Sequence, residues 1–598
     1  MLDVIKQIFS LLTLEQRKRF YILQVLVILM AFTELLGIAS IAPFMALVGD
    51  MSLLEKDGIY SKVYQLSGIN EPVNFLFITG VAVLSVLTLS TIVSMFTTWR
   101  LSLYASSIGV QLADRLYTHY MKQDWQFHAS GSSAQLTKQV STEANRISGG
   151  IIQPLMQMNA KVILALFISI SILIYNPFVA ISGLLMFVTG YLLMYKFVRK
   201  ALVLNGRRLS SSATNRFRLM NEGFGGIRDV LLLDRNKDFI DRFSIEGNVQ
   251  AKAQGLNQTI AQVPRFFIEL LAFGAMVGLV LILIKTYDGN LGAVLPILAA
   301  YALACFKLLP ALQQIYISIT QIKGNIAAYE AVKEDLIHSQ EKMSIKEIPS
   351  SNNLTLTKGI KLHNIQFTYP NKSIKAVNNI SLYIPVNNVI GIVGSSGSGK
   401  STLIDIILGL LTPQNGNIYV DDILITQENK RSWQDLLGFV PQSIFLSEGS
   451  IAENVAFGIP ADEINYAQVN KAIDLAHLTE LVNELPAGIH TKVGERGIQL
   501  SGGQRQRIGI ARALYGEADI LIFDEATSAL DGITEKIIMD AIHEFTGKKT
   551  IIMIAHRLKT VQKCDIIYLM QKGKIIDQGT YEYLVENNPE FKEMAKHS

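Results

Sequence analysis

Residues 394–402 read Gly-Ser-Ser-Gly-Ser-Gly-Lys-Ser-Thr and stand between two apolar runs. The run before them, residues 389–393, has the character of a buried strand, and the run after them, residues 403–408, has that of a helix. Glycines at such a place let the backbone turn tightly, so that its amides converge at the positive end of the following helix. The pattern G-x-x-x-x-G-K-[S/T] in this context predicts a loop that binds nucleotide phosphates.

Each residue type in this loop suits one task. The predicted nucleotide-binding residues are Gly394, Ser396, Gly397, Ser398, Gly399, Lys400, Ser401 and Thr402. Lys400 is expected to reach the β- and γ-phosphates, and the hydroxyl of Ser401 is expected to bind Mg²⁺. The expected cofactors are therefore ATP and Mg²⁺.

Two acidic residues end a second buried-strand pattern. Residues 520–523 are apolar and lead into Asp524 and Glu525. We expect Asp524 to hold Mg²⁺ and Glu525 to orient or deprotonate the attacking water. Acids at a strand end are also common on ordinary protein surfaces, so this pattern needs the phosphate loop beside it.

Three further residues fit the same chemistry. Gln442 follows Val440 and Pro441 and is expected to reach the metal and the water. His556 follows an apolar run and is expected to contact the γ-phosphate. Tyr369 precedes the first strands and is expected to stack on adenine, although a lone tyrosine more often packs in a core.

The composition points to lipid. The chain has 598 residues, of which 49% are apolar and 17% are charged, below the roughly 25% charged that is usual for soluble chains. This length predicts more than one domain. The formal net charge of +4 is small and gives no reason to expect nucleic acid. Cys305 and Cys564 lie far apart, so we expect neither a disulfide nor a metal site.

Six apolar runs approach or exceed the ~20 residues that cross a bilayer as a helix. They are residues 20–47, 73–99, 152–175, 178–198, 266–284 and 291–319. The connections 100–150 and 199–265 are long and rich in Lys and Arg, which predicts that they and both termini are cytoplasmic. Each has a break, at 126–131 and 223–226, where we expect either a short transverse helix that touches a cytosolic domain or an ordinary loop.

The chain changes character after the sixth run. We expect a membrane domain in residues 1–330, a polar linker in 331–358, and an α/β domain with a mixed sheet in 359–598, where short apolar strands alternate with helices.

A further motif, residues 500–504, reads Leu-Ser-Gly-Gly-Gln and opens a helix. Together with Lys400, Asp524, Glu525 and His556 in this order, it resembles the ATP-binding cassette exporters, specifically half-transporters with six spans ahead of one nucleotide-binding domain. The resemblance implies a type IV exporter fold of six long transmembrane helices and a P-loop NTPase domain. It also implies that Ser501, Gly503 and Gln504 of one chain meet the ATP held by another. A homodimer is the simplest expectation, and the residues leave a heterodimer open.

Ionisable residues within the spans are the internal clue to the cargo, because each is costly in a bilayer. Glu34 and Lys307 lie in the first and sixth runs, and Arg265 and Glu269 lie at the start of the fifth. One interpretation is a polar cavity that attracts an anionic group, and the other is pairing for packing alone. Residues 50–70 carry spaced apolar side chains and suggest either a short external helix at the lipid surface or a packed loop.

These same segments resemble the bacterial flippases of lipid-linked oligosaccharides. The resemblance implies a polyprenyl-pyrophosphate glycan as cargo and the bacterial cytoplasmic membrane as location. Two features depart from this resemblance. The second run has no basic residue, and Lys307 offers a point charge where an arginine would offer two parallel donors. Other hypotheses are a general lipid, drug or amphiphile exporter and an ATPase that transports nothing; a peptide exporter with its own protease is not expected.

Overall fold

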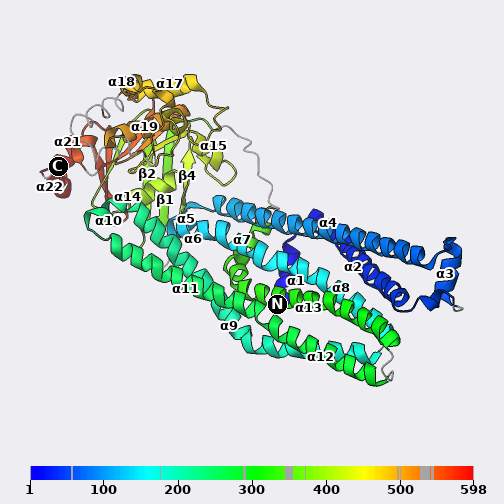
Figure 1. The fold of residues 1–598 in the computed structure, drawn as a ribbon. Helices are drawn as coiled ribbons and strands as arrows, with labels where there is room; N and C mark the ends of the chain where they lie inside the picture. The colour runs from blue at the N-terminus through cyan, green and yellow to red at the C-terminus, as the bar shows by residue number, and fades with distance from the viewer. Residues whose placement is uncertain are drawn as a thin grey trace. The chain divides into compact units, whose positions relative to one another are not determined.

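Two compact units make up the computed structural model, which describes residues 2–55, 58–175, 177–286, 291–343, 354–370, 372–494, 497, 500–525, 539, 544–555 and 557–596. The first unit comprises residues 1–123 and 127–346, and the second comprises residues 124–126 and 347–598. Figure 1 shows that long helices build the first unit, whereas the described strands belong to the second.

The helices ahead of the sheet include some of 36 to 53 residues. In chain order they are α1 (Leu2–Leu11), α2 (Leu14–Gly49), η1 (Met51–Leu54), α3 (Ile59–Ser67), α4 (Pro72–Met121), α5 (Trp125–Ser130), α6 (Ser133–Lys138), η2 (Gln139–Glu143), α7 (Ala144–Ile147), η3 (Ser148–Ile152), α8 (Gln153–Tyr175), α9 (Pro177–Gly225), α10 (Ile227–Leu232), α11 (Asn236–Gln262), α12 (Pro264–Thr286) and α13 (Leu291–Met343). The six predicted apolar runs lie in α2, α4, α8, α9, α12 and α13.

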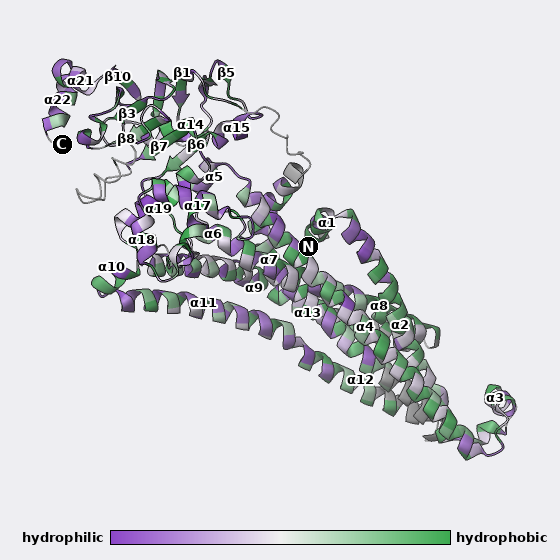
Figure 2. Ribbon diagram, turned by 90° about the horizontal axis from the view of Figure 1, so that it is seen from above, coloured by the Kyte–Doolittle hydropathy of each residue, from purple (hydrophilic) through white to green (hydrophobic). Residues whose placement is uncertain are grey.

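Several of these helices suit a bilayer by length and composition. Within the described residues, the stretches Leu14–Gly49, Pro72–Met121, Ser133–Ile174 and Asn236–Gly278 meet this description. Figure 2 shows apolar residues gathered along α2, α4 and α8, whereas α11 is more polar. Only 11% of the most apolar 18-residue stretch of α4 is buried within the chain, so lipid or another chain must cover this stretch. The chain is a membrane protein with several apolar helices.

The segment 50–70 contains the predicted short helix. In α3, Ile59, Val63 and Leu66 follow one another at helical spacing and are 80%, 51% and 87% exposed. The opposite side is packed, because the Tyr64 ring meets the Phe75 ring edge-on with 5.1 Å between centroids. One face of α3 therefore anchors it to the unit, and the other presents an apolar row to the surroundings.

Short helices occupy the two predicted breaks. The first is α5, between α4 and α6, and the second is α10, which begins directly after Gly226. Gly226 separates the end of α9 at Gly225 from the start of α10 at Ile227. The helical alternative of the sequence analysis is thus confirmed at both breaks.

The structure corrects the predicted boundary at residue 330. The helix α13 continues to Met343, so the first part of the predicted linker 331–358 is helical. Val332 and Leu336, one helical turn apart, are fully buried inside the first unit, and this burial stabilises the extra turns. A polar composition alone had suggested that the helix ends earlier.

The second unit contains two sheets. Its strands are β1 (Gly359–Phe367), β2 (Val377–Pro385), β3 (Val389–Val393), β4 (Asn415–Val420), β5 (Ile423–Leu424), β6 (Leu437–Val440), β7 (Ile520–Asp524), β8 (Thr550–Ile554), β9 (Ile566–Gln571) and β10 (Lys574–Gly579). An antiparallel sheet has the order β2-β1-β4-β5, and a larger sheet has the order β10-β9-β3-β8-β7-β6. In the larger sheet, β9, β3, β8, β7 and β6 are parallel and β10 is antiparallel, which confirms the predicted mixed sheet.

Helices cover both faces of the larger sheet. They are α14 (Lys400–Ile407), α15 (Lys430–Asp435), α16 (Ile451–Val455), α17 (Tyr466–Leu475), α18 (Thr479–Glu484), α19 (Gly502–Tyr515), α21 (Tyr581–Asn587) and α22 (Pro589–Lys596). Along β3, Ile390 and Ile392 join the core that contains Leu403 of α14, whereas Val389 and Val393 join the opposite core. This alternation is why the strand is apolar at every position but the glycine.

Candidate nucleotide-binding site

The phosphate loop connects β3 to α14, as the sequence predicts. Gly394 and Gly399 adopt φ angles of 156° and 103°, which disfavour any residue with a side chain. A Cβ atom at Gly394 would collide with the carbonyl oxygen of Met570, and one at Gly399 would collide with that of Ala376. The two glycines therefore let the loop lie close to neighbouring backbone.

Lys400 is buried at the first position of α14. Its Nζ donates hydrogen bonds to the carbonyl oxygens of Gly394 and Ser395, at 2.9 and 3.1 Å. Burial lowers the pKa of Lys400, and the carboxylates of Glu525 and Asp524 act in the opposite direction. The side chain thus folds back over the loop, where an ammonium group can meet phosphate oxygens.

The other loop residues differ in exposure. Ser396 and Gly397 form an exposed tip, Ser401 is exposed at the start of α14, and Ser398 is 1% exposed. Within the described residues, the Oγ of Ser398 has no hydrogen-bond partner. The exposed loop residues thus surround the buried ammonium group of Lys400, and the buried hydroxyl of Ser398 can still form a hydrogen bond. This arrangement fits a triphosphate.

Tyr369 lies beside the same helix, and it follows β1 instead of preceding the first strands as the sequence analysis expected. Its hydroxyl and the Oγ1 of Thr402 are 3.2 Å apart, and its ring meets Phe367 edge-on with 5.0 Å between centroids. The side chain is only partly buried. This places the tyrosine ring next to the phosphate loop, and its stacking on adenine stays a prediction.

The acidic residues and Gln442 lie at the same edge of the sheet as the loop, because β3, β8, β7 and β6 are parallel neighbours. Ile554 of β8 pairs with both Ile392 of β3 and Asp524 of β7. Two strand spacings of ~4.8 Å therefore separate Asp524 from the end of β3 by about 10 Å. This distance suits a metal ion between the acid and the phosphates.

Gln442 and Glu525 are in direct contact. The Nε2 of Gln442 donates a hydrogen bond of 2.6 Å to the Oε2 of Glu525. The backbone N–H of Glu525 donates to the carbonyl oxygen of Ile554 at 3.1 Å, and Glu525 has a φ of 52°. The residue therefore turns sharply out of the strand, and Gln442 fixes where its carboxylate points. The predicted His556 lies outside the described residues.

The Leu-Ser-Gly-Gly-Gln motif begins α19. Ser501 caps this helix by accepting a hydrogen bond from the N–H of Gln504 at 3.2 Å, and the Oε1 of Gln504 accepts one from the N–H of Ser501 at 2.8 Å. Ser501 and Gly502 are exposed, whereas Gly503 is buried. The start of α19 is thus a rigid, exposed helix N-terminus that suits an anion.

Arg512, farther along α19, was not singled out in the sequence. Its Nε donates to the carbonyl oxygen of Asn454 at 2.9 Å, and a second nitrogen donates to that of Phe445 at 3.0 Å. Phe445 follows Gln442 in the chain, so Arg512 ties the loop that carries Gln442 to the helix that carries Ser501.

The predicted cargo residues form two pairs. Glu34 is 6% exposed, accepts a hydrogen bond from Ser94 at 2.9 Å, and lies 3.5 Å from the Nζ of Lys307. Arg265 and Glu269 are 2.5 Å apart on one face of α12. The pairing that the sequence offered as one of two interpretations is therefore present.

A buried charged cluster was missed. Glu143 is fully buried and lies 2.8 Å from Lys138 and 2.9 Å from Arg146. The π-helical turn η2 brings residues 138 and 143 together, because such turns join positions five apart. Opposite charges at five- and three-residue spacing in a segment with few other charges were the available signal.

Comparison with known proteins assigns both units. Residues 20–303 match the ABC transporter transmembrane region, and residues 377–528 match the ABC transporter domain. The chain is 29% identical to the ATP-dependent lipid A-core flippase of Cupriavidus pinatubonensis over 502 residues, 82% of either protein. It is 29% identical to the heterocyst differentiation ATP-binding protein HepA of Nostoc sp. over 505 residues, 81% of this chain and 78% of that protein.

A solved structure is similar over nearly the whole length. A bacterial Atm1-family ABC exporter with ATP bound has a TM-score of 0.77 and 21% identity, and the match covers 97% of this chain and 98% of that one. At this identity the likeness shows the fold. It includes the helical unit and the unit with the sheets, in the order that the sequence predicts.

Proposed function

The chain is an ABC exporter half-transporter that binds ATP and couples its hydrolysis to transport, and from this premise we propose that it flips a polyprenyl-pyrophosphate-linked oligosaccharide across the bacterial cytoplasmic membrane. The lipid A-core flippases among its relatives support a lipid-linked cargo, since their name assigns them a glycolipid.

The observation that carries the cargo proposal is the pair of Lys307 and Glu34. The Lys307 side chain is 43% exposed on an apolar helix, whereas the Glu34 side chain is 6% exposed. An ammonium group has three donors, and the carboxylate of Glu34 lies 3.5 Å from it as an ion-pair partner. The buried carboxylate thus holds a cation on a side chain that stays partly exposed, which suits a phosphate group of the cargo.

The exposed apolar row of α3 supports the lipid part of the proposal. Ile59, Val63 and Leu66 form a surface that the chain itself leaves open. A short helix of this kind lies at a membrane surface with its apolar face in the lipid. It could contact the polyprenyl tail while Lys307 holds the pyrophosphate.

In the nucleotide site, Lys400 binds the β- and γ-phosphates, and Tyr369 stacks on the base. Ser401, Gln442 and Asp524 would hold Mg²⁺, which would neutralise charge on the phosphates. Glu525, oriented by Gln442, accepts the proton of the attacking water, and His556 contacts the γ-phosphate.

The site needs a second copy of the chain. Each chain provides one phosphate loop and one exposed α19 N-terminus, so we propose a homodimer in which Ser501, Gly503 and Gln504 of the partner close the site. We propose that both termini and the nucleotide-binding domain, residues 359–598, lie in the cytoplasm. The short helices α5 and α10 are proposed to transmit closure to the membrane helices.

The test is ATP-dependent flipping in proteoliposomes. A polyprenyl-pyrophosphate oligosaccharide is offered to the wild type and to Glu525→Gln, which keeps the fold and removes the base. Flipping by the wild type alone supports the proposal. Robust hydrolysis without flipping of this lipid overturns the cargo assignment.

A second candidate is export of another amphiphile, such as a lipid A-core glycolipid. The names of the relatives favour it. The same assay with that glycolipid separates the two, because each hypothesis predicts flipping of a different lipid.

A further inference from the structure

A cavity of about 420 Å³ lies in the first unit, and seven of the residues that line it carry carboxamide side chains. Its walls are η2, α7 and η3 on one side, α9 and α11 on a second, and α13 on a third. This volume falls in the ~300–1,000 Å³ range of small-molecule sites. No role was assigned to its residues from the sequence.

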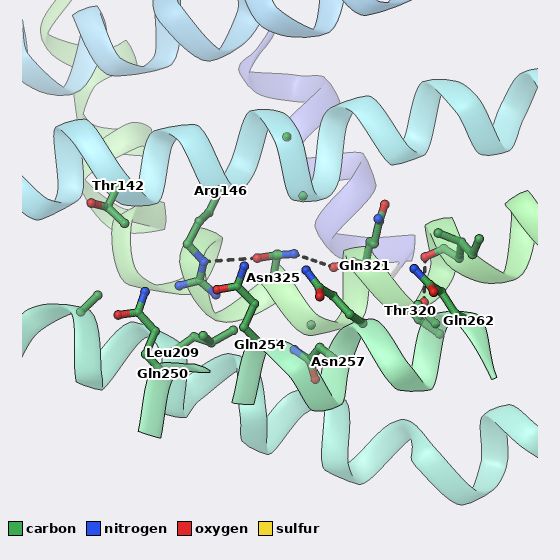
Figure 3. A pocket seen from close by; sticks show the side chains of 17 residues that line it. Thr142, Arg146, Leu209, Gln250, Gln254, Asn257, Gln262, Thr320, Gln321 and Asn325 are labelled. Atoms are coloured by element: carbon green, nitrogen blue, oxygen red, sulfur yellow. Dashed lines mark hydrogen bonds between the residues drawn. The ribbon is translucent and has the colours of Figure 1, made fainter. Parts of the chain in front are cut away.

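Four glutamines form a stripe along α11, and we call this set the glutamine stripe. Gln250, Gln254, Gln258 and Gln262 repeat at four-residue intervals, so they share one helix face and extend over about 18 Å at 1.5 Å per residue. Asn257 lies beside them, and Gln321 and Asn325 face them from α13. Figure 3 shows the labelled side chains of α11 and α13 directed into the same space, with Arg146 reaching it from α7.

Some of these amides are held in place and others are not. Gln250 accepts a hydrogen bond from Arg216 at 2.8 Å, Asn257 accepts one from Asn205 at 3.0 Å, and Asn325 accepts one from Arg146 at 3.2 Å. In contrast, the structure gives four lining carboxamides no hydrogen bond to the described residues, namely those of Gln254, Gln258, Gln262 and Gln321. The cavity thus combines fixed groups with donors and acceptors that are still available.

Two glycines make room for the amides. A Cβ atom at Gly150 would collide with the side chain of Asn325, and one at Gly324 would lie 3.1 Å from the Nδ2 of Asn257. A glycine therefore stands opposite an amide side chain on both walls. This arrangement indicates that the cavity is a regular feature of the fold and not a packing defect.

The lining favours a neutral ligand rich in hydroxyl groups. A carboxamide both donates and accepts hydrogen bonds, as does a sugar hydroxyl. Among the described residues of the lining, Arg146 alone is charged, and Glu143 already pairs with it at 2.9 Å, so a bare anion finds little free charge there. Leu209, Ile317 and Ala261 add apolar surface for the C–H faces of sugar rings.

We infer that this cavity binds the glycan headgroup of the cargo, an inference that rests on the proposed flipping of a lipid-linked oligosaccharide. The glutamine stripe ends at Gln262, directly before the apolar helix α12. A glycan held along the stripe would therefore lie next to the segment that enters the membrane. The volume of the cavity suits part of an oligosaccharide, and the rest of the glycan would extend outside it.

The test compares two lipids that differ only in the glycan. The protein is placed in lipid nanodiscs, and binding of a polyprenyl pyrophosphate with a neutral oligosaccharide is measured beside that of the same lipid without sugar. The variant is Gln254→Met with Gln258→Met, which keeps side-chain length and helix propensity but removes the hydrogen bonds. Thr259→Val is the control, an exposed residue of the same helix outside the cavity.

The wild type is expected to bind the glycosylated lipid more tightly, and the double variant is expected to lose about tenfold in affinity for it, since two net hydrogen bonds of about 0.7 kcal/mol each correspond to that factor. Binding of the sugar-free lipid should not change in the variant. Should the double variant fail to fold, Gln321→Met on the opposite wall is expected to give about a threefold loss by the same reasoning.

Two results would overturn the inference, and they are distinguishable. Equal binding of both lipids by the wild type, or an unchanged double variant, refutes the glycan site while the flippase function stands. A wild type that binds neither lipid refutes the proposed function and, with it, the glycan site.

Discussion

The two units of the chain hold their polar residues in different ways. In the second unit, Lys400 follows β3 through the phosphate loop, and Gln442 and Glu525 follow β6 and β7, so the parallel order of the strands brings these residues to one edge of the sheet. In the first unit, Glu34 of α2 meets Lys307 of α13 through helix packing, whereas Glu143 meets Lys138 and Arg146 within one helical segment, through the π-helical turn η2. A backbone ladder thus fixes the chemistry of one unit, whereas helix packing and a local change of helix register fix that of the other.

The largest expected effect lies at the strand ends. Glu525→Gln removes the base, so we expect steady ATP hydrolysis to fall by about 10³-fold while ATP binding remains. Phosphate release and nucleotide binding are measured on the same preparation. Glu517→Gln is the control, because Glu517 is a surface carboxylate paired with Lys471 at 2.6 Å. Hydrolysis by Glu525→Gln near the wild-type rate would show that Glu525 is not the base.

The next effect lies in the first unit and concerns stability. Glu143→Gln leaves Lys138 and Arg146 buried without their carboxylate, so we expect a loss of about 3–5 kcal/mol. Thermal unfolding in detergent measures it. Glu222→Gln, which removes an exposed partner of Arg218, should change stability by about 0.5 kcal/mol or less. Similar unfolding temperatures for both variants would show that the cluster does not stabilise the unit.

Much of the second unit could be predicted from the sequence, because its motifs combine residue type with a strand or helix boundary. The phosphate loop needed Gly394 and Gly399 at positive φ, and both were identified as turn residues. The hydrogen bond from Gln442 to Glu525 needed the strand order, which the sequence does not state.

The first unit was less predictable for physical reasons. The burial of Glu143 depends on the π-helical turns η2 and η3, which shift the helix register and leave no compositional trace. In the sequence, the glutamine stripe has the pattern of an ordinary solvated helix face, because only the structure shows that α13 lies opposite it. The linker boundary was set too early because Val332 and Leu336 are buried only through tertiary packing.

A smaller effect separates packing from transport at Lys307. Lys307→Met removes the exposed cation, so we expect flipping of the pyrophosphate lipid to fall about tenfold, as for one lost charge-assisted contact, with basal hydrolysis unchanged. Flipping and hydrolysis are measured in the same proteoliposomes. Lys323→Met, on the same helix beyond its apolar run, is the control. Loss of folded protein instead of transport would mean that the pair with Glu34 is structural only.

The smallest effect is a pH dependence in the second unit. Partial burial alone would raise the pKa of Asp421, but hydrogen bonds from Thr357, Gly359 and Lys358 lower it from 3.8 to about 2. The carboxylate therefore stabilises the fold above pH 3.8, and this contribution is lost as the pH falls towards 2.

Asp421→Asn should accordingly cost about 1 kcal/mol at pH 7 and less at pH 3, as measured by thermal unfolding at both values. Asp422→Asn is the matched control, since that side chain is 81% exposed. A difference between the two variants that does not depend on pH would contradict the assignment to the Asp421 carboxylate.

The measurement that tests the central claim most directly is ATP hydrolysis with and without cargo, because it reads both units at once. In nanodiscs, the wild type is expected to hydrolyse ATP severalfold faster when a polyprenyl-pyrophosphate oligosaccharide is added, and Lys307→Met is expected to lose this stimulation. Hydrolysis that stays the same with and without the lipid, in both proteins, would contradict the claim that the nucleotide site drives transport of this cargo.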